Sequence, residues 1–302
     1  MRTLTTDLLI DQVAQSLNKE LGKEMSSATV FLSCPMAPPW DDSFRQAIED
    51  LVDHYAEIHH PKPECLTVVL QTNGGYIETV ERIVRVTRTN FTEVKYIVPN
   101  CAYSAGTVLA LSGDDILMDY HSVLGPIDPQ YASPNGEYMP GMGYLAKYQE
   151  LVNTINGAPD ANAVRAEIAY LIQKFDPAKL FNIEQAIEHS KSLLKEWLPK
   201  HKFKNWTTRS SSGEAVDEAY KQQRAKEIAE ILGNATRWHS HGRGITCDDL
   251  KGEEIKLKVK NYGDMPELRN AVRKYYDLLT DYMGRRGWQA CIHTEQGFRS
   301  YI

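Results

Sequence analysis

The sequence predicts an α/β fold that contains a parallel sheet. Apolar runs at residues 66–70 and 94–98 are typical of buried strands, and each is followed by an apolar or amphipathic helical stretch. The two junctions end in small or glycine-rich turns, Asn73-Gly74-Gly75 and Tyr103-Ser104-Ala105-Gly106. Strand, helix, strand, helix is the order that right-handed crossovers produce in a parallel sheet. With 302 residues and 42% hydrophobic content, the chain is long enough to bury a sizeable core.

The N-terminal part alternates between the two kinds of element. Apolar residues on one face predict the helix at 6–21, and Pro61 ends the helix at 41–60. In order, the pattern predicts helix 6–21, strand 28–34, helix 41–60, strand 66–70, helix 77–88, strand 94–98, a helix from the Ser104 turn to residue 111, and strands 115–118 and 122–127.

After a glycine-rich loop at 133–143, the sequence changes character. Residues 144–233 carry a nearly continuous helical pattern, and an alternating strand at 254–260 and a helix at 266–283 come later. The aromatic and basic tail after Gly284 predicts no particular element. We find no internal repeat and no linker. We therefore expect one domain over 1–302, with a core of about 26–132 and 234–262, a helical insertion of about 143–233 and a C-terminal helix of about 264–284.

Charge and cysteine content exclude several classes of protein. The net charge is −6 and no dense Lys/Arg cluster occurs, so the footprint of a nucleic-acid-binding protein is missing. The five cysteines are scattered and form no CxxC pair, which argues against a disulfide framework and a zinc site. We expect no metal and no cofactor. The N-terminus lacks a signal-peptide pattern and no apolar stretch is long enough to span a membrane, so we expect a cytoplasmic protein without a membrane span.

Ser104 stands at the second strand-to-helix junction. Serine is a favoured N-cap, so one interpretation is an ordinary helix cap. The other is a nucleophile presented at a helix N-terminus, with the amide of Ala105 free to receive an oxyanion. The Asn73-Gly74-Gly75 turn is predicted to reach the same carboxyl edge of the sheet, where folds of this kind hold their sites. From these residues alone, both interpretations stay open.

Four successive segments resemble a known superfamily. They are Asn73-Gly74-Gly75 after a strand, Ala102-Tyr103-Ser104-Ala105-Gly106-Thr107, Ser112-Gly113-Asp114-Asp115-Ile116-Leu117-Met118, and Ser122-Val123-Leu124-Gly125-Pro126-Ile127-Asp128-Pro129-Gln130. Together they resemble the Clp protease and signal peptide peptidase A superfamily, and within it the serine dehydrogenase proteinase family. The resemblance covers about residues 64–132 and resumes at Trp238-His239-Ser240-His241-Gly242-Arg243-Gly244-Ile245-Thr246.

This resemblance implies a ClpP/crotonase fold, built from stacked strand-strand-helix units. It also implies a serine endopeptidase that cleaves peptides or proteins through an acyl-enzyme on Ser104. By the same matching, the amides of Gly75 and Ala105 form the oxyanion hole. That assignment is chemically sensible, because two backbone donors need no side-chain ordering.

The proton acceptor for Ser104 has competing candidates. The serine dehydrogenase proteinases are described with the order Ser, Asp, His, which the matching gives here as Ser104, Asp128 and His241. A histidine titrating near neutrality would take the serine proton, and a buried carboxylate would fix its tautomer. Non-catalytic interpretations are also open: His241 would be a surface loop histidine, and Asp128 an aspartate that caps a turn. Signal peptide peptidases use a lysine instead, and Lys147 stands at about that place. Its position toward the polar edge of a predicted helix argues against the desolvation that such a lysine needs.

Substrates and partners follow from the same comparison. We expect peptides to bind extended, adding a strand beside Gly74-Gly75 and around Leu124-Gly125. Relatives form rings or other homo-oligomers, so the resemblance implies a homo-oligomer, with the helices at 6–21 and 266–283 as expected contacts. Whether an unfoldase or a membrane partner takes part stays open.

Two other functions also stay open. A crotonase-like acyl-CoA hydrolase or isomerase would share the oxyanion hole and need no serine. A non-catalytic scaffold subunit of an oligomer would keep the fold and lack the base.

Overall fold

The computed structural model describes residues 5–58, 61–127, 129–132, 138–209, 213–238, 240 and 242–302. It is a mixed α/β fold around a seven-stranded sheet, with the strand order β10-β5-β3-β2-β1-β11-β12. The strands from β10 to β1 are parallel, whereas β11 and β12 are antiparallel. The predicted α/β fold with a parallel sheet is confirmed. The bounds are β1 Ala28–Ser33, β2 Cys65–Gln71, β3 Glu93–Ile97, β5 Asp115–Met118, β10 Lys260–Asn261, β11 Cys291–Thr294 and β12 Gly297–Tyr301.

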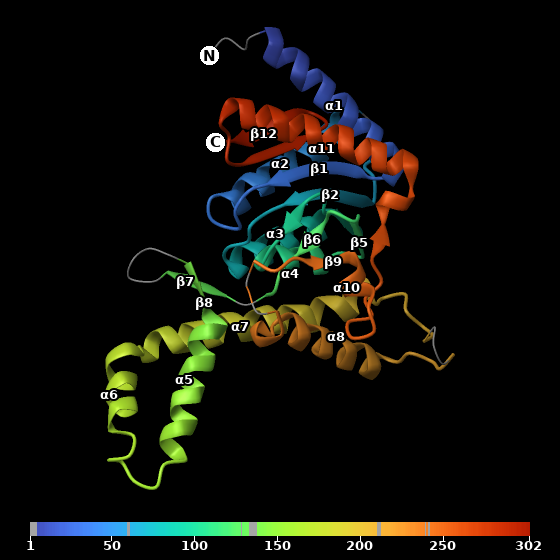
Figure 1. Ribbon diagram of the computed structural model, residues 1–302. Helices are drawn as coiled ribbons and strands as arrows, with labels where there is room; N and C mark the ends of the chain where they lie inside the picture. The colour runs from blue at the N-terminus through green and yellow to red at the C-terminus, as the bar shows by residue number, and fades with distance from the viewer. Residues whose placement is uncertain are drawn as a thin grey trace.

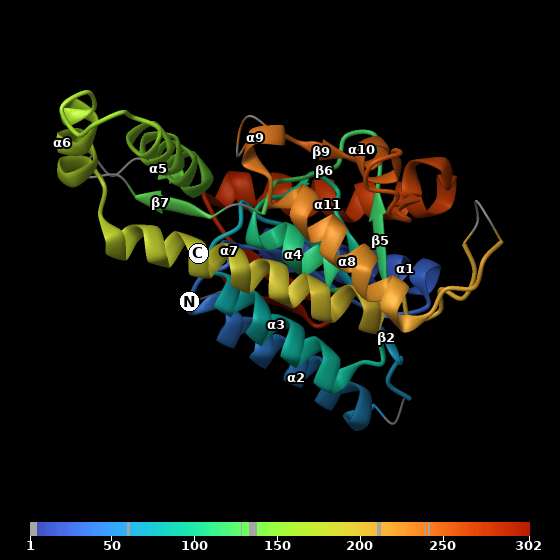
Figure 2. The same ribbon diagram turned by 90° about the horizontal axis from the view of Figure 1, so that it is seen from below.

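Helices cover both faces of this sheet, which explains why its central strands are continuous apolar runs. On β2, Val68 and Leu70 pack into one hydrophobic cluster and Val69 into the other, because successive strand side chains point to opposite faces. Figures 1 and 2 show α2 and α3 side by side on one face, and α1 along α11 on the other. The bounds are α1 Thr5–Met25, α2 Trp40–Glu57, α3 Ile77–Asn90, α4 Ala105–Leu111 and α11 Pro266–Arg286.

The C-terminal tail adds two strands to the sheet, which the sequence pattern did not predict. β11 pairs with β1, with Ser33 opposite Cys291. The ring of Trp288 stacks on that of Tyr301 with centroids 4.1 Å apart, so aromatic contacts hold the β11–β12 hairpin together. β11 is only four residues long, and so short a segment carries too few positions for a period to be recognised.

A second, small sheet carries the segment that leads to Ser104. Its strands are ordered β4 (Cys101–Ala102), β6 (Val123–Leu124) and β9 (Ile245–Thr246). β4 runs parallel to β6, and β9 runs antiparallel to it. Segments that are far apart in the sequence therefore meet beside the serine turn. Of the predicted strand at 122–127, only residues 123–124 form a strand.

The helical region lies beyond α4. α7 (Pro177–Trp197) packs against α3 and α4, and α8 (Glu218–Leu232) packs against α7. α5 (Gly141–Asn156) and α6 (Arg165–Lys174) project away from the body, as Figure 1 shows. Of the predicted strand at 254–260, only Lys260 lies in a strand. The remaining elements are β7 Gln130–Ala132, β8 Tyr138–Pro140, a π-helical turn Leu198–Lys202, α9 Ala235–Trp238, α10 Cys247–Lys251 and a 3₁₀ turn Tyr262–Asp264.

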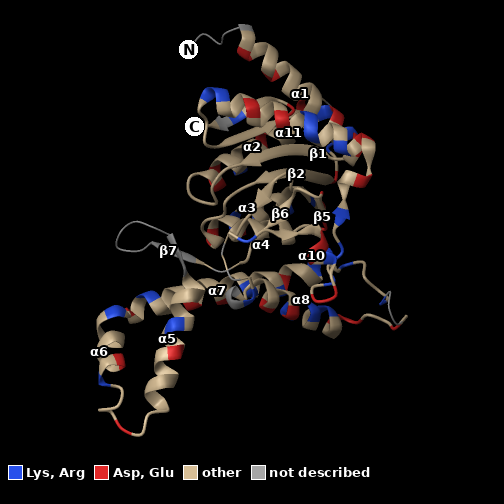
Figure 3. Ribbon diagram, viewed as in Figure 1, with Lys and Arg blue, Asp and Glu red and all other residues tan. Residues whose placement is uncertain are grey.

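Adjacent carboxylates anchor this helical region to the sheet. Asp115, at the start of β5, forms ion pairs with Lys260 and with Lys202, whose side chain is only 3% exposed. Asp114 pairs with Arg88 of α3 at 2.7 Å. Burial alone would raise the pKa of the Asp115 carboxyl, but its pairs with Lys202 and Lys260 outweigh burial and hold that pKa below its usual value. Elsewhere acidic and basic residues are interspersed along the helices, as Figure 3 shows for α11 and α5.

Candidate active site

Ser104 lies at the turn between β4 and α4 in a backbone conformation that serine rarely adopts. Its φ is +53° and its ψ is −118°, in the region that favours glycine. Its side chain makes no capping hydrogen bond to α4, so the helix-cap interpretation does not hold. The residue is half-buried. The turn therefore presents a serine hydroxyl at a strained strand-to-helix junction, a local geometry that exposes nucleophiles in other hydrolases.

The glycine turn after β2 packs directly against the serine turn. Gly74 has a φ of +93°, and a methyl group built on it would lie 2.8 Å from Cβ of Ser104 and 3.3 Å from the nitrogen of Ala105. Only a residue without a side chain permits this approach. Thr72, just before the turn, forms a parallel bridge with Ala102. The two turns thus meet, as the sequence predicted.

Two backbone amides at these turns have no backbone partner among the described residues. Within the described ranges, neither the N–H of Gly75 nor that of Ala105 donates to a backbone acceptor. Gly75 has a φ of +144°, and a methyl group there would collide with the carbonyl of Met36. The N–H of Ala105 is one of the donors that a helix start leaves without an intrahelical partner. Both amides belong to the two turns that meet at this edge of the sheet.

The backbone of Met36 forms hydrogen bonds on both sides of Gly75, a contact that the sequence did not indicate. Its N–H donates to the carbonyl of Gly74 at 2.8 Å, and its own carbonyl accepts from the N–H of Tyr76 at 2.6 Å. These bonds flank Gly75 on both sides and hold its peptide in place. The loop around Met36 is rich in proline, and that composition predicts irregular structure without indicating which turn the loop contacts.

Leu124 and Gly125 present no free strand edge. β6 is the middle strand of its sheet, so β4 and β9 occupy both edges beside Leu124, which is fully buried. The N–H of Gly125 donates to the Thr107 hydroxyl at 2.9 Å, and the Gly125 carbonyl oxygen lies 2.8 Å from the same Oγ1. A substrate strand has no place to pair with these two residues while β4 and β9 keep their positions.

Asp128 and His241, the predicted acid-base pair, lie outside the described residues. The residues that border them pair with α8 and with the small sheet that carries the serine turn. Ile127 donates its N–H to the carbonyl of Leu232 at 3.1 Å, and Ile245 of β9 pairs with Leu124 of β6. Their roles stay predictions.

Lys147 lies in α5, within the projecting helical pair. Its side chain is 54% exposed, and its Nζ is 2.9 Å from a carboxylate oxygen of Glu150 on the same helix. A lysine that acts as a base near neutral pH needs an apolar, desolvated environment or a neighbouring cation. Lys147 instead has a solvated surface position and an anionic partner.

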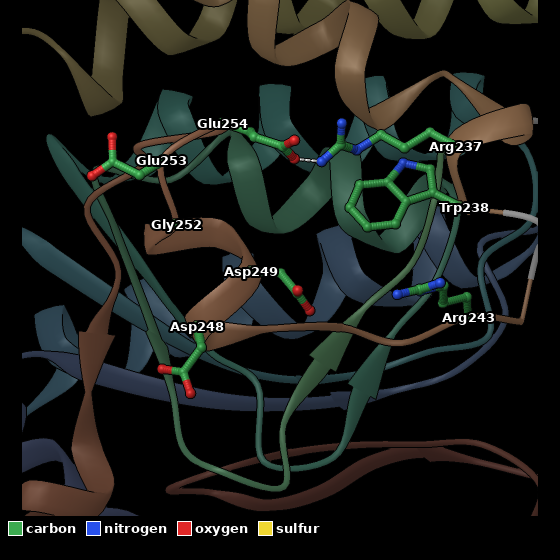
Figure 4. A pocket seen from close by; sticks show the side chains of 8 residues that line it. All are labelled: Arg237, Trp238, Arg243, Asp248, Asp249, Gly252, Glu253 and Glu254. Carbon is green, nitrogen blue, oxygen red and sulfur yellow. Dashed lines mark ion pairs between the residues drawn. The ribbon is translucent and has the colours of Figure 1, made fainter.

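A surface hollow of about 300 Å³ lies beside β9 and α10. Figure 4 shows Arg237, Trp238 and Arg243 on one side of it and Asp248 and Glu253 on the other. Arg237 is ion-paired with Glu254, and the guanidinium groups of Arg237 and Arg243 lie 5.2 Å and 5.9 Å from the centre of the Trp238 ring. The hollow therefore belongs to the late segment of the chain, and cation–π contacts order its wall.

Other chemistry at this edge has less support. Among the described residues, no group of three or more His, Cys, Asp or Glu side chains is placed to hold a metal ion. Cys101 of β4 precedes the serine turn, but burial raises the pKa of its thiol and so disfavours the reactive thiolate.

No helix in the described ranges is long and apolar enough to cross a membrane.

Two curated proteins of Methanocaldococcus jannaschii are similar to this chain. The uncharacterized protein MJ0137 of Methanocaldococcus jannaschii is 28% identical over 199 residues, which are 66% of this chain and 54% of that protein. The uncharacterized protein MJ1495 of the same organism is 25% identical over 233 residues, 77% of this chain and 62% of that protein. The chain thus spans little more than half the length of these relatives.

Solved structures give weaker likenesses. A mutant of the 1510-N membrane-bound stomatin-specific protease has a TM-score of 0.43 at 16% identity, covering 81% of this chain and 82% of that one. A second mutant of that protease, in complex with a substrate peptide, has a TM-score of 0.40 at 19% identity, covering 76% and 74%. ClpP1 from Listeria monocytogenes has a TM-score of 0.41 at 10% identity, covering 84% and 99%. We draw no functional conclusion from likenesses of this size.

The family comparison concerns the part of the chain that holds both turns. Residues 47–143 match the model of a family described as ClpP-like SDH-type serine proteinase. This stretch contains the glycine turn, Ser104 and Gly125, the same residues that carried the resemblance in the sequence. Over residues 47–143 the chain is therefore similar to the ClpP-like SDH-type serine proteinase family, in agreement with the resemblance seen in the sequence.

Proposed function

We propose that this protein is a serine peptidase that cleaves peptide bonds through an acyl-enzyme on Ser104. The observation that carries the proposal is the contact between the serine turn and the glycine turn. This contact brings a strained, half-buried serine close to two backbone amides, those of Gly75 and Ala105. Neither amide donates to a backbone acceptor in the described ranges. A nucleophile and preorganised oxyanion donors at one edge are two of the components that acyl transfer needs, beside a base.

In the proposed reaction, the Ser104 hydroxyl attacks the carbonyl carbon of the scissile peptide bond. The N–H groups of Gly75 and Ala105 receive the oxyanion of the tetrahedral intermediate, and one such donor is worth on the order of 10²–10³ in rate. The serine proton passes to a base and then to the leaving amine, and water releases the acyl group by the reverse path. We assign the base to His241, oriented by Asp128.

We place the substrate in an extended form beside Gly75. The backbone of Gly75 is flanked by the two hydrogen bonds to Met36, while its own N–H has no backbone acceptor in the described part of the chain. A peptide that pairs there gains main-chain hydrogen bonds and carries its carbonyl toward the serine turn. We further propose that the protein acts as a homo-oligomer in the cytoplasm.

Hydrolysis of casein and of short fluorogenic peptides tests this proposal. The wild-type protein should hydrolyse at least one of them, and Ser104→Ala should lower the rate by about 10³-fold or more. Ser190→Ala is the matched control, because the Ser190 hydroxyl donates back to the Ala186 carbonyl within α7, at 2.9 Å. Full peptide hydrolysis by Ser104→Ala, or no hydrolysis by wild type in any oligomeric state, would reject the proposal. Acyl-CoA hydrolysis that survives Ser104→Ala would favour the crotonase-like alternative.

A further inference from the structure

Thr107, in the first turn of α4, is fully buried, and its hydroxyl joins three backbone groups. Its Oγ1 lies 2.8 Å from the carbonyl oxygen of Ala102 and 2.8 Å from that of Gly125. It also accepts the N–H of Gly125 at 2.9 Å. A hydroxyl has one proton, so it donates to one carbonyl at a time while it accepts from Gly125.

The three groups lie on either side of the serine turn. Ala102 ends the strand that leads into Ser104. Gly125 packs on the turn itself, since a methyl group built on it would lie 3.1 Å from Cα of Tyr103 and 3.3 Å from the nitrogen of Ser104. The hydroxyl of Thr107 therefore joins the chain entering the turn to the chain running past it.

The strand pairing beside this link is short. β4 and β6 form only two residue pairs, the second being Ala102 with Leu124. Where that pairing ends, the Thr107 hydroxyl continues the link from Ala102 to Gly125. Thr107 lies in the same helical turn as Ala105. The hydrogen bonds of Thr107 therefore also help to position the Ala105 amide, which we assign to the oxyanion.

We propose that Thr107 is a positioning residue for the reaction of Ser104. Its hydroxyl sets the distance between Ala102 and Gly125 and so holds the serine hydroxyl and the Ala105 amide in their reactive places. The inference rests on the proposed function of Ser104. Since Thr107 is fully buried, its loss should slow the chemical step and leave substrate binding nearly unchanged. A displacement of about 1 Å in such a site costs on the order of 10² in rate.

The test compares the rate at which a fluorophosphonate acylates the full-length protein, together with kcat and KM for a peptide. Thr107→Val keeps the shape and removes the hydroxyl, and it should lower acylation and kcat by about 10²-fold with little change in KM. Thr107→Ser keeps the hydroxyl and should restore the rate close to wild type. Thr87→Val is the matched control, because Thr87 is also fully buried and its hydroxyl donates to the Val84 carbonyl at 2.9 Å within α3.

Circular dichroism confirms folding before each rate is measured, and Thr107→Ala replaces Thr107→Val if the latter does not fold. A folded hydroxyl-free variant that reacts at the wild-type rate would overturn the inference. So would a loss in Thr107→Ser as large as in Thr107→Val, or an equal loss in Thr87→Val. If wild-type Ser104 is not acylated at all, the proposed function fails and this inference fails with it. The two failures are thus distinguished by the wild-type reaction alone.

Discussion

The main chain of Gly74 lies against the side chain of Ser104, so that a methyl group at Gly74 would stand 2.8 Å from the serine Cβ. The serine is itself held at a positive φ. Its position is therefore set by a neighbouring turn as well as by its own strand and helix. Substitutions at either turn should move the serine and the amides together.

Gly74→Ala should abolish the proposed peptidase activity although it replaces no catalytic residue. The added methyl would force the two turns apart, and a shift of about 1 Å lowers the rate on the order of 10²-fold. The measurement is kcat/KM on a peptide that wild type cleaves. Gly284→Ala is the control, because a Cβ at Gly284 in α11 meets no atom within 4 Å. If the two variants had equal kcat/KM, the close contact between the two turns would not be needed for activity.

Ser104→Gly should make the protein more stable while removing its activity. Glycine adopts a φ of +53° without the steric cost that a side chain bears, and relief of such strain is worth about 1 kcal/mol. Urea unfolding should therefore give the order Ser104→Gly above Ser104→Ala, with Ser104→Ala close to wild type. If Ser104→Gly were the least stable of the three, the backbone at residue 104 would be unstrained.

Lys147→Ala should leave catalysis intact. The lysine is 54% exposed and its pair with Glu150 lies on the surface of α5, where such pairs contribute about 0.3–0.5 kcal/mol. We expect kcat/KM close to wild type and a correspondingly small loss in the free energy of unfolding. A loss of activity comparable to that of Ser104→Ala would instead identify Lys147 as the base.

The Asp115 ion pairs should make stability depend on acid pH. The folded-state pKa of Asp115 lies below its ordinary value of 3.8, so its contribution is complete above that value and is lost as pH falls through the lower folded pKa. Asp115→Asn leaves the buried Lys202 ammonium without its carboxylate and should cost about 3 kcal/mol at pH 7. Urea unfolding at pH 7, 5 and 3 measures the free energy of unfolding. Between pH 5 and pH 3 this free energy should fall less in the variant than in wild type. If the free energy of unfolding fell equally in both proteins, groups other than Asp115 would cause the acid sensitivity.

The sequence allowed prediction of those features that depend on local patterns. The glycine turn and the serine turn each follow an apolar strand, so their meeting at one sheet edge follows from the order of the elements. Ile255, Leu257 and Val259 are buried, as their alternation predicts, yet residues 254–259 join no strand. Their burial comes from packing on the core instead of ladder pairing.

The features that were missed depend on contacts between distant segments. The backbone of Met36 reaches Gly74 and Tyr76 from a proline-rich loop, and the Thr107 hydroxyl reaches Gly125. A methionine in a loop and a threonine in a helix carry no local signal of such contacts. The occupied edges of β6 were equally invisible, because the partner β9 comes from the far end of the chain.

The identity of the residue that a fluorophosphonate modifies tests the central claim most directly. Tandem mass spectrometry of the labelled, digested wild-type protein should locate one phosphonyl adduct on Ser104, and Ser104→Ala should take up none. A protein that cleaves peptides while its adduct lies elsewhere, or while Ser104 remains unmodified, would contradict the assignment of Ser104 as the nucleophile.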